Sequence, residues 1–287
     1  MSGIPTNRTN IGLPNSVSSE ILQKTQEQSA VMQLARQITL PGNGAQIPVI
    51  TSDPVASWVS ETGLKPVSNP GLDKKVMQAH KLAVLVPFSN EFRRDAAALY
   101  DAIVERLPLA LAKKFDETVF FGPATGSLAN FDNLSSVTAQ SLASSVYGGF
   151  VAADTDIATQ GGIMNGIVLA PQGKSVVLGA TDQSKRPLFI NNVAEGAVPV
   201  ILGARTELSK GAYVTGTPNV LGFAGDWSQA VYGTVEGVKI DYSSDATLDI
   251  GSGNVINLFQ QNMFAVRAEI EVGFRADTSV FNALVDA

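Results

Sequence analysis

The chain has 287 residues, of which 45% are hydrophobic and only 16% are charged, and its formal net charge at pH 7 is −6. Globular domains usually carry charges on about a quarter of their residues, so much of this surface is either neutral and polar or covered by partners. The negative balance argues against tight wrapping of nucleic acid, which needs a basic surface. The absence of cysteine excludes disulfides, thiolate nucleophiles and cysteine-based metal sites.

The first residues of the chain, 1–16, are polar and lack the apolar core of a secretory signal. The longer apolar runs, such as 82–86, are far too short to span a bilayer, so no membrane association is expected. We interpret residues 1–16 as an extended arm without a core of its own. A helix is predicted from about Glu20 to Gln37, capped by a serine and ended by the proline and glycines at 41–44.

A long two-stranded ribbon is predicted between residues 46 and 88. Prolines at 48 and 54 exclude a helix from 46 to 58, and a segment rich in proline, glycine and asparagine from 62 to 73 forms the tip. The chain returns as one strand over 75–88, whose alternation predicts a single apolar face: Val76, Leu82, Val84 and Val86.

This ribbon offers little apolar surface that could cover Trp58. An isolated two-stranded ribbon is also marginally stable in water. The simplest remedy is that the ribbon lies on another copy of the same chain. Assembly is therefore the first functional hypothesis, ahead of catalysis.

A long helix follows, with Ser89 or Asn90 as its cap and Gly122-Pro123 as its end. We expect Pro108 to kink or divide it near Val104. Its apolar ridge recurs every fourth residue: Leu99, Ile103, Leu107, Leu111, Phe115 and Val119. Its opposite, polar face carries Arg94, Asp101, Glu105, Lys113 and Asp116.

The middle of the chain, from 124 to about 253, is dense in glycine and indicates a mixed α/β unit with short strands. Apolar runs predict strands at 166–171, 198–203 and 235–240, and two segments favour helix, at 141–153 and 174–178. The last strand is clear, because five apolar residues alternate with polar ones or glycine: Val266, Ala268, Ile270, Val272 and Phe274. Phe281 and Leu284 form a short apolar tail.

The residues of an active site are not evident. His80 is the single histidine, and nothing in the sequence supplies the nucleophile and orienting carboxylate that it would need as a base. The acids at 241, 245 and 249 are too widely spaced for a calcium loop, and the glycine pairs lack the context of a dinucleotide or phosphate loop. We predict no catalytic, cofactor-binding or metal residues and no cofactor. A hydrolase with paired carboxylates remains an open alternative.

The order of several segments resembles a known family. Trp58-Val59-Ser60-Glu61 in an extended loop precedes the strand 80–89, a long helix and Phe120-Phe121-Gly122. Gly225-Asp226-Trp227-Ser228-Gln229-Ala230 follows a glycine-rich middle, and the strand 262–269 comes last. This order resembles the major capsid proteins of tailed bacteriophages, with the Hong Kong 97-type fold, over nearly the whole chain.

The resemblance implies an α+β fold with named parts. Residues 1–45 are the N-arm and 46–83 the extended loop. Residues 84–130 and 263–287 form the peripheral domain with its long spine helix, and 131–262 form the axial domain. It also implies a structural, non-enzymatic protein that assembles in the host cytoplasm into the icosahedral phage head, as hexamers and pentamers around double-stranded DNA.

On this basis we predict which residues lie at the interface between subunits. Trp58 and Val59 are the expected apolar anchors, and charged residues of the loop are expected to meet charges on an adjacent subunit: Glu61, Lys65, Lys74, Lys75 and Lys81. DNA is enclosed without sequence-specific binding. Because Met1 begins almost at the N-arm, a separate scaffolding protein is expected, together with a portal, and cleavage or crosslinking of this subunit is not.

Two alternatives stay open. An encapsulin, the shell protein of a bacterial nanocompartment, has the same fold but encloses a cargo enzyme, and the polar N-arm favours the phage head. A carboxylate hydrolase would be a small soluble oligomer with activity.

Overall fold

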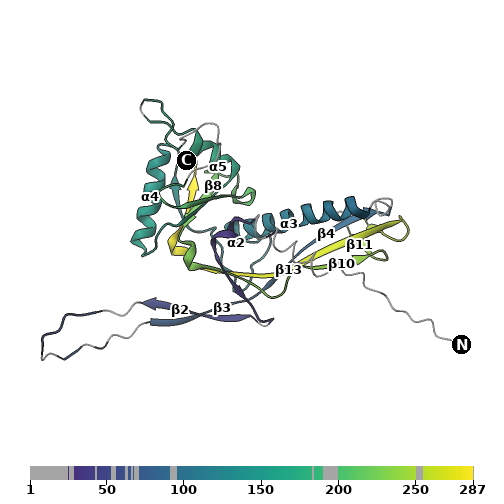
Figure 1. Ribbon diagram of the computed structural model, residues 1–287, viewed down its shortest axis with the longest axis horizontal. Coiled ribbons are helices and arrows are strands. Elements are labelled where there is room, and N and C mark those ends of the chain that lie inside the picture. The colour runs from purple at the N-terminus through teal and green to yellow at the C-terminus, as the bar shows by residue number, and fades with distance from the viewer. Residues whose placement is uncertain are drawn as a thin grey trace.

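The computed structural model describes most of the chain in eleven stretches, and the side chains of 47–52, 71–73 and 96–105 are outside the description. The described stretches are residues 25, 29–42, 44–52, 56–61, 64–65, 67, 71–90, 96–182, 184–189, 200–249 and 255–286. Two sheets with their helices form the body, and a thin ribbon projects from the region where the two sheets meet (Figure 1). The predicted α+β class is therefore confirmed.

The first sheet, called here the long sheet, is built around β13 (Met263–Ala276). One edge of β13 pairs with β4 (His80–Ser89). Along its other edge lie β10 (Lys239–Ser243) and then β9 (Ala230–Thr234), and β1 (Arg36–Thr39) pairs with β9 in parallel. The alternation predicted for the last strand is confirmed, because all five of its apolar residues are buried.

Helix α3 (Ala96–Phe121) runs along the long sheet (Figure 1). Its ridge is confirmed where side chains are described: Leu107 and Leu111 pack against the sheet, and Phe115 and Val119 enter the larger core. Pro108 lies inside the helix and does not divide it. The helix ends at a glycine with φ of +79°, a left-handed conformation that glycine adopts without strain.

The second sheet has the strand order β5-β14-β8-β6-β7. Its strands come from distant parts of the chain: β5 (Thr138–Ser141), β6 (Gly166–Leu169), β7 (Arg205–Leu208), β8 (Val220–Gly225) and β14 (Phe281–Val285). The last of these, expected as a short apolar tail, is a fully buried inner strand. Burial on both faces explains why the three inner strands, β6, β8 and β14, are largely apolar runs.

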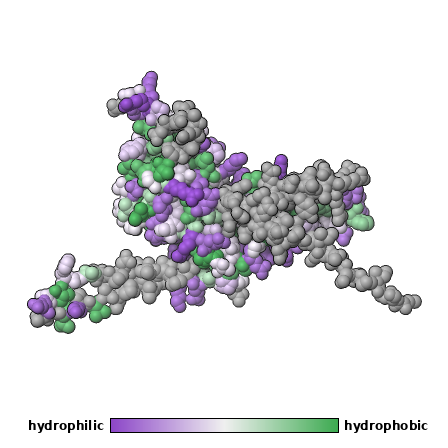
Figure 2. Space-filling view, in the orientation of Figure 1, coloured by the Kyte–Doolittle hydropathy of each residue, from purple (hydrophilic) through white to green (hydrophobic). Residues whose placement is uncertain are grey.

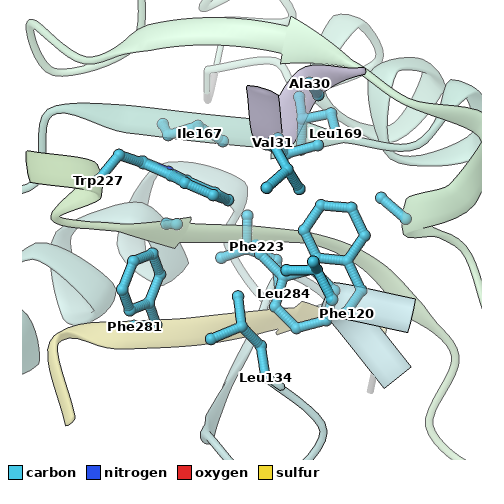
Figure 3. Close-up of a cluster of buried hydrophobic side chains, with 14 of the residues drawn as sticks. Ala30, Val31, Phe120, Leu134, Ile167, Leu169, Phe223, Trp227, Phe281 and Leu284 are labelled. Atoms are coloured by element: carbon cyan, nitrogen blue, oxygen red, sulfur yellow. The ribbon is translucent and has the colours of Figure 1, made fainter. Parts of the chain in front are cut away.

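Helices and aromatic rings close the core of the second sheet. Helices α2 (Ala30–Leu34), α4 (Val146–Thr159) and α5 (Pro171–Leu178) all contribute buried side chains to it. Figure 3 shows Phe223 in the middle of this core, and its ring stacks on that of Phe120 with centroids 4.7 Å apart. Short 3-10 helices lie in the connections: η2 (Lys210–Ala212), η3 (Trp227–Gln229) and η4 (Thr278–Val280).

Two hairpins complete the fold. The ribbon pairs β2 (Ala45–Ser52) with β3 (Gly71–Met77), and a small hairpin pairs β11 (Thr247–Asp249) with β12 (Val255–Asn257). The ribbon points away from the end of the body that carries the small hairpin (Figure 1).

Several predicted elements differ from the structure. The helix expected up to Gln37 ends at Leu34, because the following residues pair with β9 as strand β1. The return strand is broken at 78–79, where the chain leaves β2 and pairs with β13 instead. In the run 235–240 only the last two residues are strand. In the run 198–203, residues 198–199 lie outside the description and Ile201 makes only an isolated bridge.

The predicted domain boundaries do not follow the sheets. Strands β9 and β10, placed in the axial segment 131–262, belong to the long sheet. Strand β14, placed in the peripheral segment 263–287, belongs to the second sheet. Helix α2, placed in the N-arm, contributes Val31 to the larger core. The division into domains stays a prediction, because sheet membership alone does not define it.

Candidate assembly interface

The tip of the ribbon carries large apolar side chains that its own chain leaves uncovered. Trp58 is 104% exposed, and Leu64 and Val67 are 99% and 87% exposed. Figure 2 shows hydrophobic side chains at this end of the molecule, far from the body. Several large apolar side chains left almost fully exposed at the end of a projecting segment indicate an interaction site.

The residues predicted for the interface divide into two groups. Trp58, Val59, Glu61 and Lys65 are exposed and lie together in the tip segment. Lys74 is exposed on strand β3, closer to the body. For these residues a role between subunits stays a prediction.

For Lys75 and Lys81 the structure identifies specific partners within the chain. The Lys75 Nζ donates a hydrogen bond to the carbonyl of Ala276 at 3.0 Å, so this lysine ties the ribbon to the end of β13. The Lys81 Nζ lies 3.3 Å from a carboxylate oxygen of Glu271, across the β4–β13 pair, and therefore belongs to the long sheet. The sequence showed neither partner, because both are about 190 to 200 residues away along the chain.

The ribbon is anchored by a small hydrophobic cluster at its root. Met77, Leu40 and Val231 form this cluster and are buried, and Ala45 and Ala79 pack against it. The sequence alternation predicted Val76 as the apolar side chain of the ribbon, but Val76 is 40% exposed. The alternation changes phase because the break at 78–79 separates β3 from β4.

Further apolar side chains are exposed on the body, and the predictions from the sequence did not indicate their exposure. Val200 and Leu202 lie in the connection before β7, and Ile163 follows α4. Phe259 is 78% exposed just after β12. An aromatic residue among asparagines and glutamines, as at 257–262, is the local signal that could have indicated it. These positions give the body its own candidate contacts, separate from the ribbon.

Asp116 was predicted on the polar face of the long helix, opposite its apolar ridge, but the residue is buried in the structure. It is 1% exposed and accepts hydrogen bonds from the hydroxyls of Ser29 and Ser209 and from the main chain of Ala30 and Val31. Burial raises the pKa of Asp116 to about 6, against the opposing effect of these hydrogen bonds. The carboxylate thus joins three segments that are distant in sequence: α2, α3 and the start of η2.

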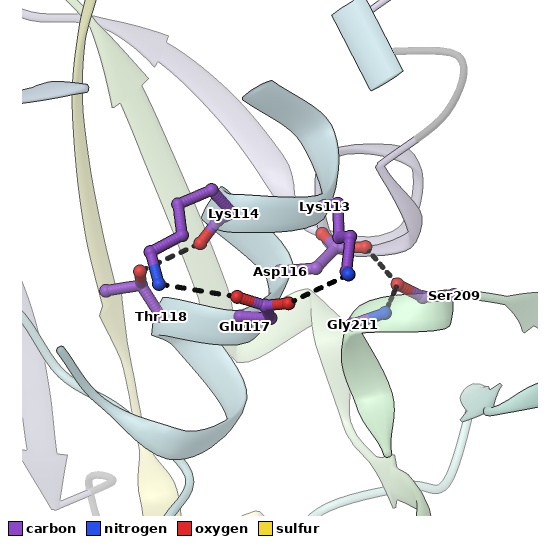
Figure 4. A network of polar contacts seen from close by, with 7 residues as sticks. All are labelled: Lys113, Lys114, Asp116, Glu117, Thr118, Ser209 and Gly211. Atoms are coloured by element: carbon purple, nitrogen blue, oxygen red, sulfur yellow. Dashed lines mark hydrogen bonds and ion pairs between the residues drawn. The ribbon is translucent and has the colours of Figure 1, made fainter. Parts of the chain in front are cut away.

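Figure 4 shows this buried contact beside an exposed one on the same helix. One turn of helix presents Lys113, Lys114 and Glu117 to solvent, with the lysine nitrogens 3.5 and 3.3 Å from the Glu117 carboxylate. Side chains next to each other in sequence therefore have opposite surroundings, because α2 and η2 cover only the side of α3 that carries Asp116.

The groups considered for chemistry have structural partners. The Nε2 of His80 lies 2.8 Å from the carbonyl oxygen of Ala129, and its ring meets Phe131 edge to face. Asp241, one of the three widely spaced acids, pairs with Arg267 at 2.6 Å. Within the described residues, no three histidine, cysteine or acidic side chains are grouped to hold a metal ion. None of the helices in the described part of the chain is both long and apolar enough to cross a membrane.

Comparison with known proteins agrees with the fold. The probable major capsid protein gp17 of Mycobacterium phage D29 is 28% identical over 282 residues, covering 94% of this chain and 88% of that protein. The major capsid protein of Staphylococcus phage 80alpha is 26% identical, covering 96% and 85%. A solved structure from Mycobacterium phage Adephagia matches with a TM-score of 0.71 at 18% identity, covering 91% of this chain and 90% of that one.

A chain from the capsid of an empty GTA particle matches with a TM-score of 0.64 at 14% identity, over 100% of this chain and 95% of that chain. At such identities these structures show the fold, and they confirm the expected Hong Kong 97-type architecture. The sequence relatives are major capsid proteins of phages, and they favour the phage interpretation over the encapsulin alternative. The sequence itself matches the phage capsid family over residues 10–280, and the chain belongs to that family.

Proposed function

We propose that this protein is the major capsid protein of a tailed bacteriophage, and that its copies close into an icosahedral head of pentamers and hexamers around double-stranded DNA. Membership of the phage capsid family and the names of the relatives support this. The observation that carries it in this chain is the projecting ribbon, whose tip exposes Trp58 fully to solvent.

The energetics of the tip favour assembly. Burying a large apolar side chain stabilises by about 1.5–3 kcal/mol, so covering Trp58, Leu64 and Val67 contributes on the order of 5 kcal/mol per copy. Part of this offsets the entropy lost when the tip is ordered. The remainder is repeated in every subunit of a closed shell, so modest contacts give a stable particle. Exposed ion pairs of Glu61, Lys65 and Lys74 with a neighbour would add about 0–1 kcal/mol each.

The proposed role is structural and has no catalytic step. The family is that of phage capsid proteins, and two of the groups considered for chemistry have structural partners: Asp241 pairs with Arg267, and His80 contacts the Ala129 carbonyl. The net charge of −6 supports a shell that encloses DNA without gripping it. Assembly in the host cytoplasm with a separate scaffolding protein and a portal completes the proposal.

Electron microscopy of the expressed protein, with size-exclusion chromatography, tests this function. We expect closed shells or capsomers for the wild-type chain. A Trp58→Ser variant is expected to lose most particles, whereas Ser57→Ala, at an exposed neighbouring position, keeps them. A small soluble oligomer without particles would contradict the proposal. Purified particles that contained a protein cargo in place of DNA would favour the encapsulin alternative.

A further inference from the structure

Two glycines lie directly opposite each other on neighbouring strands of the long sheet. Gly233 of β9 and Gly273 of β13 are direct partners in the antiparallel pair. Neither has the positive φ that would require glycine for backbone reasons. The reason for glycine at these two positions therefore lies in the space that a larger side chain would occupy.

That space is filled by the root of the ribbon. A Cβ on Gly233 would lie 2.5 Å from the Leu40 Cγ and 2.9 Å from the Met77 Sδ. A Cβ on Gly273 would lie 2.9 Å from the Met77 Cγ and 2.7 Å from the carbonyl oxygen of Gln78. The glycine pair thus forms a socket, defined here as Gly233 and Gly273, into which Met77 and Leu40 insert.

Met77 occupies the position where the ribbon ends. It is the last residue of β3 and is fully buried, and β4 of the body begins three residues later. On its other side Gly44, at the base of β2, has φ of +85° and a backbone so close that a Cβ would lie 2.6 Å from the Met77 carbonyl oxygen. The Lys75 hydrogen bond to Ala276 adds a polar tie at the same place.

A small change of angle at this root has a large effect at the tip. Strand β3 has seven residues, so it extends about 23 Å at about 3.3 Å per residue. A rotation of about 10° at Met77 would move the far end of the strand by about 4 Å. That displacement is enough to take an apolar anchor out of the surface that receives it.

We propose that Met77, seated in the Gly233–Gly273 socket, is a positioning residue that fixes the direction in which the ribbon leaves the body. The ribbon is then aimed at the neighbouring copy before the two meet, which lowers the entropy lost on association. This inference rests on the proposed assembly function and adds the element that directs the assembling arm. It also explains why a methionine, flexible enough to fill an irregular gap, stands at this position.

The distance between ribbon and body in the unassembled subunit tests the proposal. The chain has no cysteine, so Ser60→Cys in the tip and Ser136→Cys in the body, both exposed, can carry spin labels. We expect a narrow distance distribution for the otherwise wild-type chain and a clearly broader or displaced one for Met77→Ala. Met77→Leu, which keeps the volume, should restore it, and Val76→Ala, on the exposed side of the same strand, should leave it unchanged. If Met77→Ala does not fold, Met77→Val replaces it, and its distance distribution is compared with that of the otherwise wild-type chain in the same way.

Particle yield supplies the second readout. At equal concentration of folded subunit, we expect Met77→Ala to give at least about tenfold fewer regular shells, and Met77→Leu to give near wild-type yield. A narrow, unshifted distance distribution in Met77→Ala would overturn the proposed positioning role of Met77. A broad distance distribution in the wild-type background would overturn it as well. A wild-type protein that forms neither shells nor capsomers would instead refute the proposed function, and the distance measurement would still decide the role of Met77.

Discussion

Acidification should stabilise the fold through Asp116, opposite to the usual behaviour of a carboxyl group. Burial raises the pKa of Asp116 from 3.8 to about 6 in the folded chain. Between these two values the folded chain binds a proton that the unfolded chain does not, so stability falls as the pH rises through this window and is constant above it. At about 1.36 kcal/mol per pKa unit, the difference corresponds to about 3 kcal/mol.

The substitution Asp116→Asn isolates this contribution because it removes one titrating group and keeps the shape of the side chain. Other carboxyls act in the opposite direction: hydrogen bonds from the Arg186 main chain and from the Asn219 side chain lower the pKa of Asp182 and Asp286. Their effect is common to both proteins and cancels in the difference between wild type and variant. Any constant offset from the altered hydrogen bonds also leaves the pH dependence of that difference untouched.

The measurement is denaturant unfolding of the unassembled subunit at several pH values from 7.5 to 3.5. The free energy of unfolding of the wild type, relative to Asp116→Asn, is expected to rise by about 3 kcal/mol over this range. Glu117→Gln is the matched control, because its exposed ion pairs with Lys113 and Lys114 contribute at most about 1 kcal/mol. A flat difference for Asp116→Asn, or one that falls on acidification, would refute the reasoning.

Three further outcomes are expected in unfolding of the unassembled subunit. Arg275→Met should cost about 1–3 kcal/mol, because Arg275 pairs with Asp132 at 2.9 Å in a mostly buried setting; an unchanged midpoint would contradict this. Gly166→Ala should cost about 1–3 kcal/mol and shift the emission of Trp227, since its Cβ would lie 2.5 Å from the indole; unaltered emission would exclude that clash. Trp58→Ser should stay within about 0.5 kcal/mol of wild type, and a larger loss would place this side chain in the subunit's own core.

The sequence predicted best those elements whose pattern repeats along one segment. The apolar residues of β13 recur every second residue and those of α3 about every fourth, and in each element they lie on the buried face. The order of these segments also supported the fold through its resemblance to a family. Local periodicity was sufficient because each of these elements keeps the same face buried along its described length, even though the partner on that face changes.

Prediction failed where a distant segment changes the environment of a single residue. Asp116 lies on the polar side of its helix by spacing, but α2 and η2 bring Ser29 and Ser209 over it, from 87 and 93 residues away. Val76 and Met77 exchange roles because β3 and β4 have different partners. No window of sequence contains these partners, so no local pattern could have indicated them.

The two tryptophans show how this chain separates folding from assembly. Trp227 is buried in the body, where its indole nitrogen donates to the carbonyl of Gly166 and its ring meets Phe281 edge to face. Trp58 stands on a ribbon whose described residues reach a buried cluster only around Met77, at its root. The body can therefore fold with its large core complete while the tip stays uncovered. A shell subunit needs this division, because the apolar surface that joins it to a neighbour must remain available after the chain has folded.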